Sequence, residues 1–455
     1  MEFTFAHFAG LLLTLLLVAA VGFWAATQVR TTTDFAVGGR SAGASIVAGA
    51  IIGSIIGGAS TVGTAQLAFT IGLSAWWFTL GAGIALFLLA FGFAIPLRQS
   101  GLQTISQFLV ANFGTKAGPL TSAASSVGIF FSIVANILSA LPLVAAILNI
   151  KISLAAIAVF ALILLFVFWG GLRGAGLIGL IKIVLIYCTL GAVGWIAYHS
   201  LGGISGLHAS FPEYPWFSLF GRGLWTDMAS GLSLVVGTLS TQTYIQAIYS
   251  ARDIRTARLG SIIAAVATLP TGIPAILAGL YMRIHHPDIA PIDTLPLFIL
   301  SYLPPWLGGI AIAALLLAAV GSAAGLALGV GTTLSRDILT KWWNPADEKR
   351  SLLANRITVL VVALLATLFT FGNLKSLVLE WNFLSMGLRG AGIFLPLTAA
   401  IFFPGRIAAP WAIRAMAAGA AVALSWNFIF PDTIDPLYAG LAACALCLAA
   451  GWQKK

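Results

Sequence analysis

The chain is a succession of apolar runs, and the most informative of them, Ala42 to Leu73, is interrupted in its middle. The run is long enough to cross a bilayer, for which about 20 apolar residues suffice. It is nevertheless broken by four glycines, Gly53, Gly57, Gly58 and Gly63. Backbone groups that a break releases inside a membrane need partners, so irregular backbone occurs there only where protein buries it or where it lines a polar cavity. The pattern predicts a discontinuous helix with a binding site at mid-membrane, as in secondary transporters.

Apolar runs of this length predict an all-α integral membrane protein with about 13 transmembrane helices. The predicted spans are 6-28, 42-70, 73-96, 119-148, 152-169, 174-198, 224-249, 260-283, 305-334, 352-371, 376-402, 409-428 and 436-452. We expect one transmembrane transporter domain, residues 1-455, because no interval between the spans is long enough for a soluble domain. An odd number of spans places the two termini on opposite sides of the membrane.

The ten spans from 42 to 402 divide into two sets of five, and an odd number per set inverts the second set relative to the first. We therefore expect a five-plus-five inverted repeat, 42-199 and 224-403, with an extra N-terminal helix at 6-28 and two extra C-terminal helices in 409-452. The second repeat should also open with a discontinuous helix, and its first span contains Gly237 and a polar run at 237-246. Alternatively, glycine and serine only allow the helices to pack closely.

The composition excludes a soluble protein. Residues are 60% hydrophobic and 8% charged, with a mean hydropathy of +1.02, whereas soluble domains carry about 25% charged residues. The net charge of +10 is scattered between apolar runs, a pattern typical of topology signals and not of nucleic-acid binding. One set of alternate loops holds sixteen basic residues and the other holds four. The positive-inside rule therefore predicts a multi-pass protein of the cell (plasma or inner) membrane with its N-terminus outside and its C-terminus in the cytoplasm.

Four stretches, in this order, resemble the sodium/solute symporter family, whose members have the inverted-repeat fold first seen in the bacterial leucine transporter. They are DFAVGGRSAG, QTYIQAIYSARDIRTARLG, PIDTLPLFILSYLPP and AALLLAAVGSAAGLALGVGTTLSRDIL. The resemblance spans most of the chain and implies sodium-coupled symport of a small organic solute by alternating access.

The resemblance also implies a sodium site between the first broken helix and the span at 305-334. Carried across residue by residue, its ligands are the carbonyls of Gly53, Ile56 and Ala319 and the hydroxyl of Ser322. The sequence has Ala323 where many members have a second hydroxyl, and Ile178-Gly179 where many have Thr-Asp. A hard cation such as sodium needs several oxygens, so these departures weaken the implied site.

Lys182 stands near this implied site, at a position where glutamine is frequent in the family. It lies nine residues beyond Arg173, or roughly 13 Å along a helix, which is deep for a lysine that reaches for the surface. Its protonated amine would fill the space of a sodium ion. A proton-coupled transporter that uses Lys182 in place of sodium is therefore the alternative to sodium coupling.

Arg389 is the second basic residue at membrane depth, about 20 Å from Lys375 along its helix. A guanidinium binds carboxylates through two parallel hydrogen bonds, so Arg389 is a candidate for binding an anionic solute. Alternatively, it caps carbonyls of a neighbouring helix. Apart from Glu380, the acidic residues fall in loops or at chain ends. Because no buried acid is available for an ammonium group, the sequence favours an anionic or neutral solute.

Other solute-binding candidates are polar residues in or beside the two breaks. They are Ser60, Thr64 and Gln66 from the first, Thr238, Thr241 and Gln242 from the second, and Thr268 in the following span. The histidines fall at span edges without further ligands nearby, so we expect no metal site beyond sodium.

These observations favour a transporter that performs no covalent chemistry. An enzyme would need a nucleophile or paired acids at membrane depth, and the sequence shows neither. A sensor that kept the transporter fold is a further alternative, but the sequence ends at Lys455 without room for a signalling domain. The expected partners are the lipid bilayer, a small-molecule solute and the coupling ion, without a cofactor; protein partners are not predicted.

Overall fold

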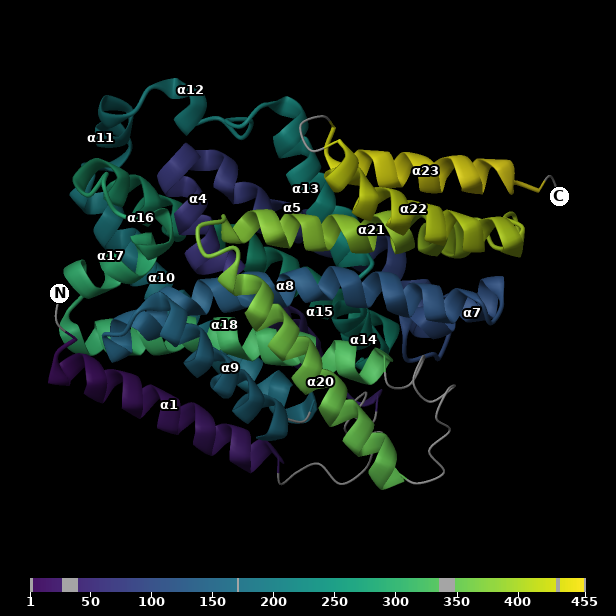
Figure 1. Cartoon of the computed structure of the whole chain (residues 1–455), viewed down its shortest axis with the longest axis horizontal. Coiled ribbons are helices and arrows are strands. Elements are labelled where there is room, and N and C mark those ends of the chain that lie inside the picture. Colours follow the sequence, from purple (N-terminus) through teal and green to yellow (C-terminus); the bar gives the residue numbers. More distant parts are fainter. Residues whose placement is uncertain (1–2, 27–39, 170–171, 335–347, 431–433, 454–455) are drawn as a thin grey trace.

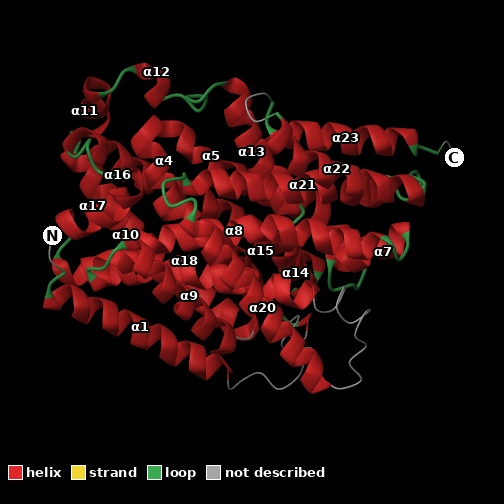
Figure 2. Ribbon diagram, in the orientation of Figure 1, coloured by secondary structure: helices red, strands yellow, loops and turns green. Residues whose placement is uncertain are grey.

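The computed structural model describes residues 3–26, 40–169, 172–334, 348–430 and 434–453, and these are helical without any β-strand (Figure 2). The helices are α1 (Phe5–Ala26), α3 (Ala44–Ile55), α4 (Thr64–Ile71), α5 (Trp77–Leu88), α6 (Ala94–Gln99), α7 (Ile105–Phe113), α8 (Ala117–Leu148), α9 (Ile152–Trp169), α10 (Leu172–Ser200), α11 (Gly203–Ser210), α12 (Glu213–Trp216), α13 (Leu224–Leu239), α14 (Gln242–Ser250), α15 (Ile254–Thr268), α16 (Gly272–His285), α17 (Thr294–Tyr302), α18 (Pro305–Leu334), α20 (Glu348–Phe371), α21 (Val378–Phe402), α22 (Ala409–Ile429) and α23 (Pro436–Ala450).

Long helices run side by side along the long axis of the molecule, and the two termini lie at opposite ends of that axis (Figure 1). In the centre, α8 packs against both α18 and α21, while α10 packs against α3 and α18. Within the described ranges, six helical stretches are long and apolar enough to cross a membrane by length and composition. Helices occupy every predicted span. The number of thirteen crossings stays a prediction.

The predicted break in the first core helix is confirmed. Helix α3 ends at Ile55, and Ile56 has extended backbone angles, φ −78° and ψ 94°. The chain then turns through Gly57 and Gly58 and continues as a π-helical segment, Ala59–Gly63, that leads into α4. Gly58 is required because a β-carbon there would lie 1.5 Å from the hydroxyl oxygen of Ser139 on α8.

The second predicted break is confirmed as well. Helix α13 ends at Leu239, Ser240 and Thr241 have non-helical backbone angles, and α14 begins at Gln242. Gly237 lies inside α13, before the break, and serves packing instead. A β-carbon on Gly237 would lie 2.5 Å from the β-carbon of Met386, so this glycine allows α13 and α21 to approach closely.

Side chains satisfy the backbone groups that the first break releases. The amide of Gly57 donates to the hydroxyl of Ser60 (3.1 Å), and the amide of Gly58 donates to the side-chain oxygen of Asn136 on α8 (3.1 Å). The carbonyl of Gly57 accepts hydrogen bonds from Ser60 and Thr61, both at 3.0 Å. Because buried backbone groups without partners are costly, these bonds make irregular backbone possible inside the bundle.

Candidate functional site

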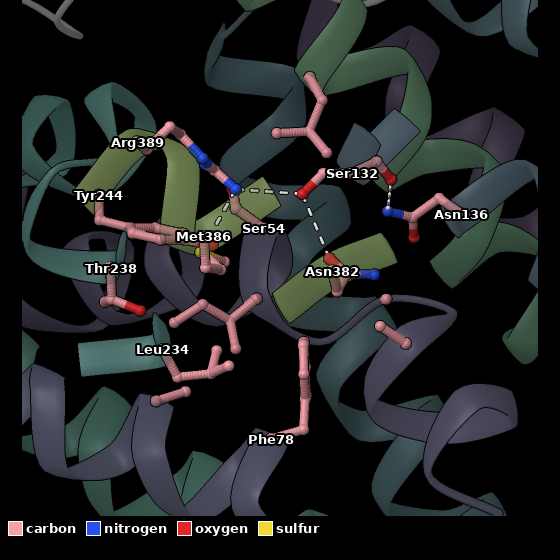
Figure 3. A pocket seen from close by; sticks show the side chains of 15 residues that line it. Ser54, Phe78, Ser132, Asn136, Leu234, Thr238, Tyr244, Asn382, Met386 and Arg389 are labelled. Atoms are coloured by element: carbon pink, nitrogen blue, oxygen red, sulfur yellow. Dashed lines mark hydrogen bonds between the residues drawn. The ribbon is translucent and has the colours of Figure 1, made fainter. Parts of the chain in front are cut away.

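A small internal cavity lies between the two breaks (Figure 3). Its volume is ≈ 20 Å³, which is room for about one water molecule. The first broken helix, α5, α8, α13, α14, α18 and α21 all contribute to its wall. The polar side chains that line it are Ser54, Ser132, Asn136, Thr238, Tyr244, Asn382 and Arg389. The cavity is therefore the place where polar groups from both halves of the chain meet.

Arg389 is the charged residue of this cavity wall, and it is 1% exposed. Its Nη1 donates to the hydroxyl of Thr241 beside the second break (2.8 Å). Its Nη2 donates to the hydroxyls of Ser385 (2.8 Å) and Ser132 (3.1 Å), and its Nε donates to the carbonyl of Ser385 (3.1 Å). All of these partners are neutral, and no carboxylate in the described part of the chain forms an ion pair with Arg389. The guanidinium is thus positioned by hydroxyl groups while its charge stays uncompensated.

The spacing of residues on α21 explains how the guanidinium reaches the cavity. Asn382, Met386 and Arg389 are separated by four and three residues, which places them on one face of the helix. Across from this face, Gly128 on α8 makes room for the arginine stem, because a β-carbon there would lie 2.5 Å from Cγ of Arg389. Gly390 and Gly392 beside Arg389 allow close contacts with neighbouring helices. In particular, a β-carbon on Gly390 would lie 2.1 Å from Val236 of α13.

Two buried polar atoms in the cavity wall have no hydrogen-bond partner. They are the amide nitrogen of Asn382 and the hydroxyl of Thr238. The oxygen of the same Asn382 amide accepts a hydrogen bond from Ser132 (3.2 Å), so the amide is held with its nitrogen unpaired (Figure 3). Buried polar groups almost always have partners. Two unpaired groups in one cavity therefore mark a place where a polar ligand can supply the missing bonds.

Lys182 lies outside this cavity wall, against the first break. Its Nζ donates to the carbonyl of Gly53 (2.7 Å) and to the hydroxyl of Ser322 on α18 (2.9 Å). The lysine side chain is 6% exposed. The amine therefore bridges Gly53 and Ser322, two of the four residues that the family resemblance implied as sodium ligands.

The other two implied sodium ligands lie beside the same break. Ile56 is the extended residue of the break and is 1% exposed. Ala319 faces Gly58, where a β-carbon would lie 3.2 Å from that of Ala319. Ala323, on the same helix as Ser322, is fully buried and brings no side-chain oxygen. The Gly53 carbonyl of the first broken helix and the Ser322 hydroxyl of α18 thus meet at the Lys182 amine. We call this place, with Ile56 and Ala319 beside it, the cage.

Several predicted solute-binding residues of the first break bond to the protein itself. Ser60 exchanges hydrogen bonds with Gly57, and Thr64 donates to the carbonyl of Ala59 (3.1 Å). Gln66 binds the chain before α21, where its Oε1 accepts from the amide of Val378 (2.9 Å). None of these three side chains lines the cavity.

The second break divides its predicted residues between two places. Thr238 lines the cavity. Thr241 does not line the cavity, but it accepts a hydrogen bond from Arg389, which does. Gln242 lies away from the cavity, where its Oε1 accepts from the amide of Ile105 at the start of α7 (2.9 Å). Thr268 is buried with an unpaired hydroxyl, but it does not line the cavity either.

Four polar residues at or beside this cavity were not predicted from the sequence: Ser132 and Asn136 on α8, and Asn382 and Ser385 on α21. A signal for them exists, because polar residues at spacings of three and four within an apolar helix share one face, and that face points into the bundle. Ser132, Asn136 and Ser139 follow this spacing, as do Asn382, Ser385 and Arg389.

The sequence matches a known family over most of its length. The model of the Sodium:solute symporter family matches residues 35–419. The high-affinity choline transporter 1 of Drosophila melanogaster is 24% identical over 393 residues, which cover 81% of this chain and 62% of that protein. The chain thus spans less than two thirds of the length of this relative.

Solved transporters share the fold. A Na⁺-coupled sialic acid symporter in its substrate-bound, outward-open state superposes with a TM-score of 0.80 at 18% identity, over 99% of this chain and 97% of that one. Mhp1, a nucleobase-cation-symport-1 family transporter in a closed conformation with bromovinylhydantoin bound, superposes with a TM-score of 0.60 at 13% identity, over 92% of this chain and 95% of that one. With the two breaks, these similarities confirm the predicted fold class, an inverted-repeat transporter fold. The repeat boundaries 42-199 and 224-403 stay predictions.

Proposed function

Because the chain belongs to the sodium:solute symporter family, we propose that it is a secondary transporter that carries a small organic anion across the cell membrane by alternating access. Membership of the family makes it a multi-pass membrane transporter. The finer proposal, an anionic solute, rests on one observation: Arg389 is buried in the wall of the central cavity with neutral partners alone.

The uncompensated charge of Arg389 favours an anion for an energetic reason. A buried charge is costly unless an opposite charge accompanies it, and a carboxylate on the solute would provide that charge through two parallel hydrogen bonds. The unpaired amide nitrogen of Asn382 and the unpaired hydroxyl of Thr238 would donate to further oxygens of the same solute. A quaternary ammonium such as choline would instead meet a like charge. We therefore infer that this chain and the choline transporter to which it is similar differ in solute.

The small volume of the cavity supports alternating access. With room for about one water molecule, the cavity admits no organic solute until the wall opens. At one end of the first broken helix, the amide of Ala42 donates to the carbonyl of Ser250, the last residue of α14, and the carbonyl of Ala42 accepts from the amide of Arg252, both at 3.1 Å. Gln66 links the opposite end of the first broken helix to Val378. We propose that opening breaks these two sets of contacts in turn, and that the end with Ala42 faces the cytoplasm.

The coupling cation has two candidates at one place, the cage between the first break and α18. Sodium, with Gly53, Ile56, Ala319 and Ser322 as ligands, is favoured by the family. A proton on Lys182 is the second candidate, and the two hydrogen bonds that Lys182 makes in this cage favour it.

A ligand screen followed by uptake tests the proposed solute class. Purified full-length protein is heated with lactate, succinate, glutamate, sialic acid, glucose or choline, since a solute that binds the folded state raises its apparent stability. We expect stabilisation by a carboxylate and none by choline. Uptake of the same labelled carboxylate into proteoliposomes should saturate and should exceed that of protein-free vesicles. Stabilisation and uptake of choline in place of any carboxylate would refute the anion proposal.

A further inference from the structure

The first break creates a carbonyl that no helical amide can satisfy. In a continuous helix, the carbonyl of Gly53 would accept from the amide of Gly57. The break turns that amide towards the hydroxyl of Ser60. The Nζ of Lys182 takes its place and lies 2.7 Å from the Gly53 oxygen. The positive charge of the lysine therefore lies at the end of a helix whose terminal carbonyls favour cations.

The partners of Lys182 are those of a bound metal ion and not those of an ordinary buried lysine. A buried ammonium usually pairs with a carboxylate, but Lys182 donates to one carbonyl and one hydroxyl. Oxygen atoms of these two kinds are what hard cations take as ligands. The helices that hold these oxygens, α3 and α18, both pack against α10, which carries the lysine.

A sodium ion and this ammonium exclude one another. An ion of calcium's size, such as sodium, lies about 2.4 Å from its oxygen ligands. A sodium ion bound to Gly53 would therefore lie at most about 5 Å from the Lys182 nitrogen, given the 2.7 Å hydrogen bond. Repulsion between two unit charges at that distance, with an effective dielectric constant of about 20, weakens binding of the second ion by roughly 100-fold or more.

The cage also has few oxygens left for a second cation. Two of its oxygens, those of Gly53 and Ser322, already accept from Lys182. Ala323 beside Ser322 adds none. Sodium would have to bind through the remaining carbonyls, next to a fixed positive charge. The residues present therefore fit an ammonium group and do not fit sodium.

We propose that the ammonium of Lys182 is the resident cation of this cage, so that sodium does not bind there and the protein transports its solute without sodium. A group that relatives take from solution is here part of the chain. The binding part of this inference stands by itself, whereas its transport part rests on the proposed function.

Equilibrium binding of radioactive sodium to the purified full-length protein at neutral pH tests the binding part. The wild-type protein should show no saturable sodium binding up to about 100 mM, with potassium chloride holding the ionic strength constant. Lys151→Met, in which an exposed lysine between α8 and α9 is replaced, is the matched control and should behave like the wild type. Saturable binding to the wild type that is lost in Ser322→Ala would overturn the inference.

A gain of sodium binding tests the cause. Lys182→Met removes the charge and keeps an unbranched side chain that fills the space. Ala323→Ser supplies the hydroxyl that the cage lacks. The double variant, with folding verified by size-exclusion chromatography and thermal unfolding, should bind sodium, whereas Ala323→Ser alone should not because the ammonium remains. Equal sodium binding by Ala323→Ser alone and by the double variant would show that the ammonium excludes nothing.

Uptake tests the transport part. Uptake of the labelled carboxylate from the screen into proteoliposomes should be equal within about twofold in sodium chloride and in potassium chloride at matched ionic strength. A tenfold or larger stimulation by sodium would overturn the transport part. If no labelled carboxylate enters the vesicles under any condition, the proposed function fails, while the sodium-binding result still decides the occupant of the cage.

Discussion

The side-chain oxygen of Asn136 on α8 lies 3.1 Å from the backbone nitrogen of Gly58 and accepts its hydrogen bond. The amide of Asn136 donates in turn to the carbonyl of Ser132, one turn earlier on the same helix (2.8 Å). Asn136 therefore replaces, from a neighbouring helix, a bond that the first core helix cannot make for itself. The break depends on α8, and α8 also carries Ser132 to Arg389.

Asn136→Leu should destabilise the protein because it leaves the Gly58 amide buried without a partner. The expected cost is about 1–3 kcal/mol of unfolding free energy. A fall in the midpoint of thermal unfolding in detergent measures it. Asn112→Leu, which removes an exposed asparagine that bonds only within α7, should shift the midpoint little. Equal midpoints for the two variants would contradict this role of Asn136.

Gly58→Ala should prevent correct packing of the break, because the added β-carbon would lie 1.5 Å from the Ser139 hydroxyl oxygen. We expect a loss of folded protein as measured by size-exclusion chromatography. Ser139→Gly in the same chain removes the clashing atoms and should restore part of it. Gly191→Ala on α10 is the matched control, since a β-carbon there meets nothing within 4 Å. A well-folded Gly58→Ala protein would show that the break has room for a β-carbon beside Ser139.

Arg389→Gln should abolish binding and uptake of the anionic solute while the protein stays folded. Removing one partner of a buried charge pair costs about 2–5 kcal/mol, or at least roughly 30-fold in affinity. Arg389→Lys should recover little, because a point charge does not replace a planar fork. Solute-dependent thermal stabilisation and uptake are the two readouts. Arg255→Gln, at an exposed position on α15, controls for loss of an arginine. Normal uptake by Arg389→Gln would show that this residue is structural.

Thr241→Val tests whether the second break positions the guanidinium. The change keeps the shape of the side chain and removes the oxygen that accepts from Nη1 of Arg389 at 2.8 Å. A hydrogen bond to a charged group contributes about 1.5–3 kcal/mol, so we expect KM for the anion to rise by roughly tenfold or more. Thr241→Ser keeps the oxygen and should restore KM. If the serine and valine variants behave alike, the hydroxyl has no positioning role.

The sequence predicted both breaks because the groups responsible are local. Gly57, Gly58 and the hydroxyl residues near them lie close together in the sequence, so they can be recognised without knowledge of the fold. Their position in the middle of a membrane span indicates a break in the helix. The sequence also indicated that Lys182 and Arg389 lie too deep to reach the surface. The sequence could not show which side chains satisfy the backbone groups that the breaks release. Asn136 meets Gly58 across 78 positions of sequence, and only the packing of α8 against the break brings them together.

The same limit explains why some predicted solute-binding residues do not line the cavity. Gln66 and Gln242 are polar residues next to a break, as a solute-binding residue would be, but each meets the first amide of another helix. Gln66 satisfies the amide of Val378, and Gln242 satisfies that of Ile105. Which way a polar side chain turns depends on the unpaired backbone group nearest to it in space.

The stem that joins the Lys182 amine to α10 changes how the protein responds to its surroundings. A dissolved ion fills its site according to its concentration. A transporter that needs a bound sodium ion therefore works more slowly at low salt and faster at high salt. A cation attached to the chain has a local concentration that the sodium content of the medium does not alter. If the Lys182 ammonium is the resident cation, as we propose, the protein should be indifferent to salinity and should serve a cell where sodium is scarce.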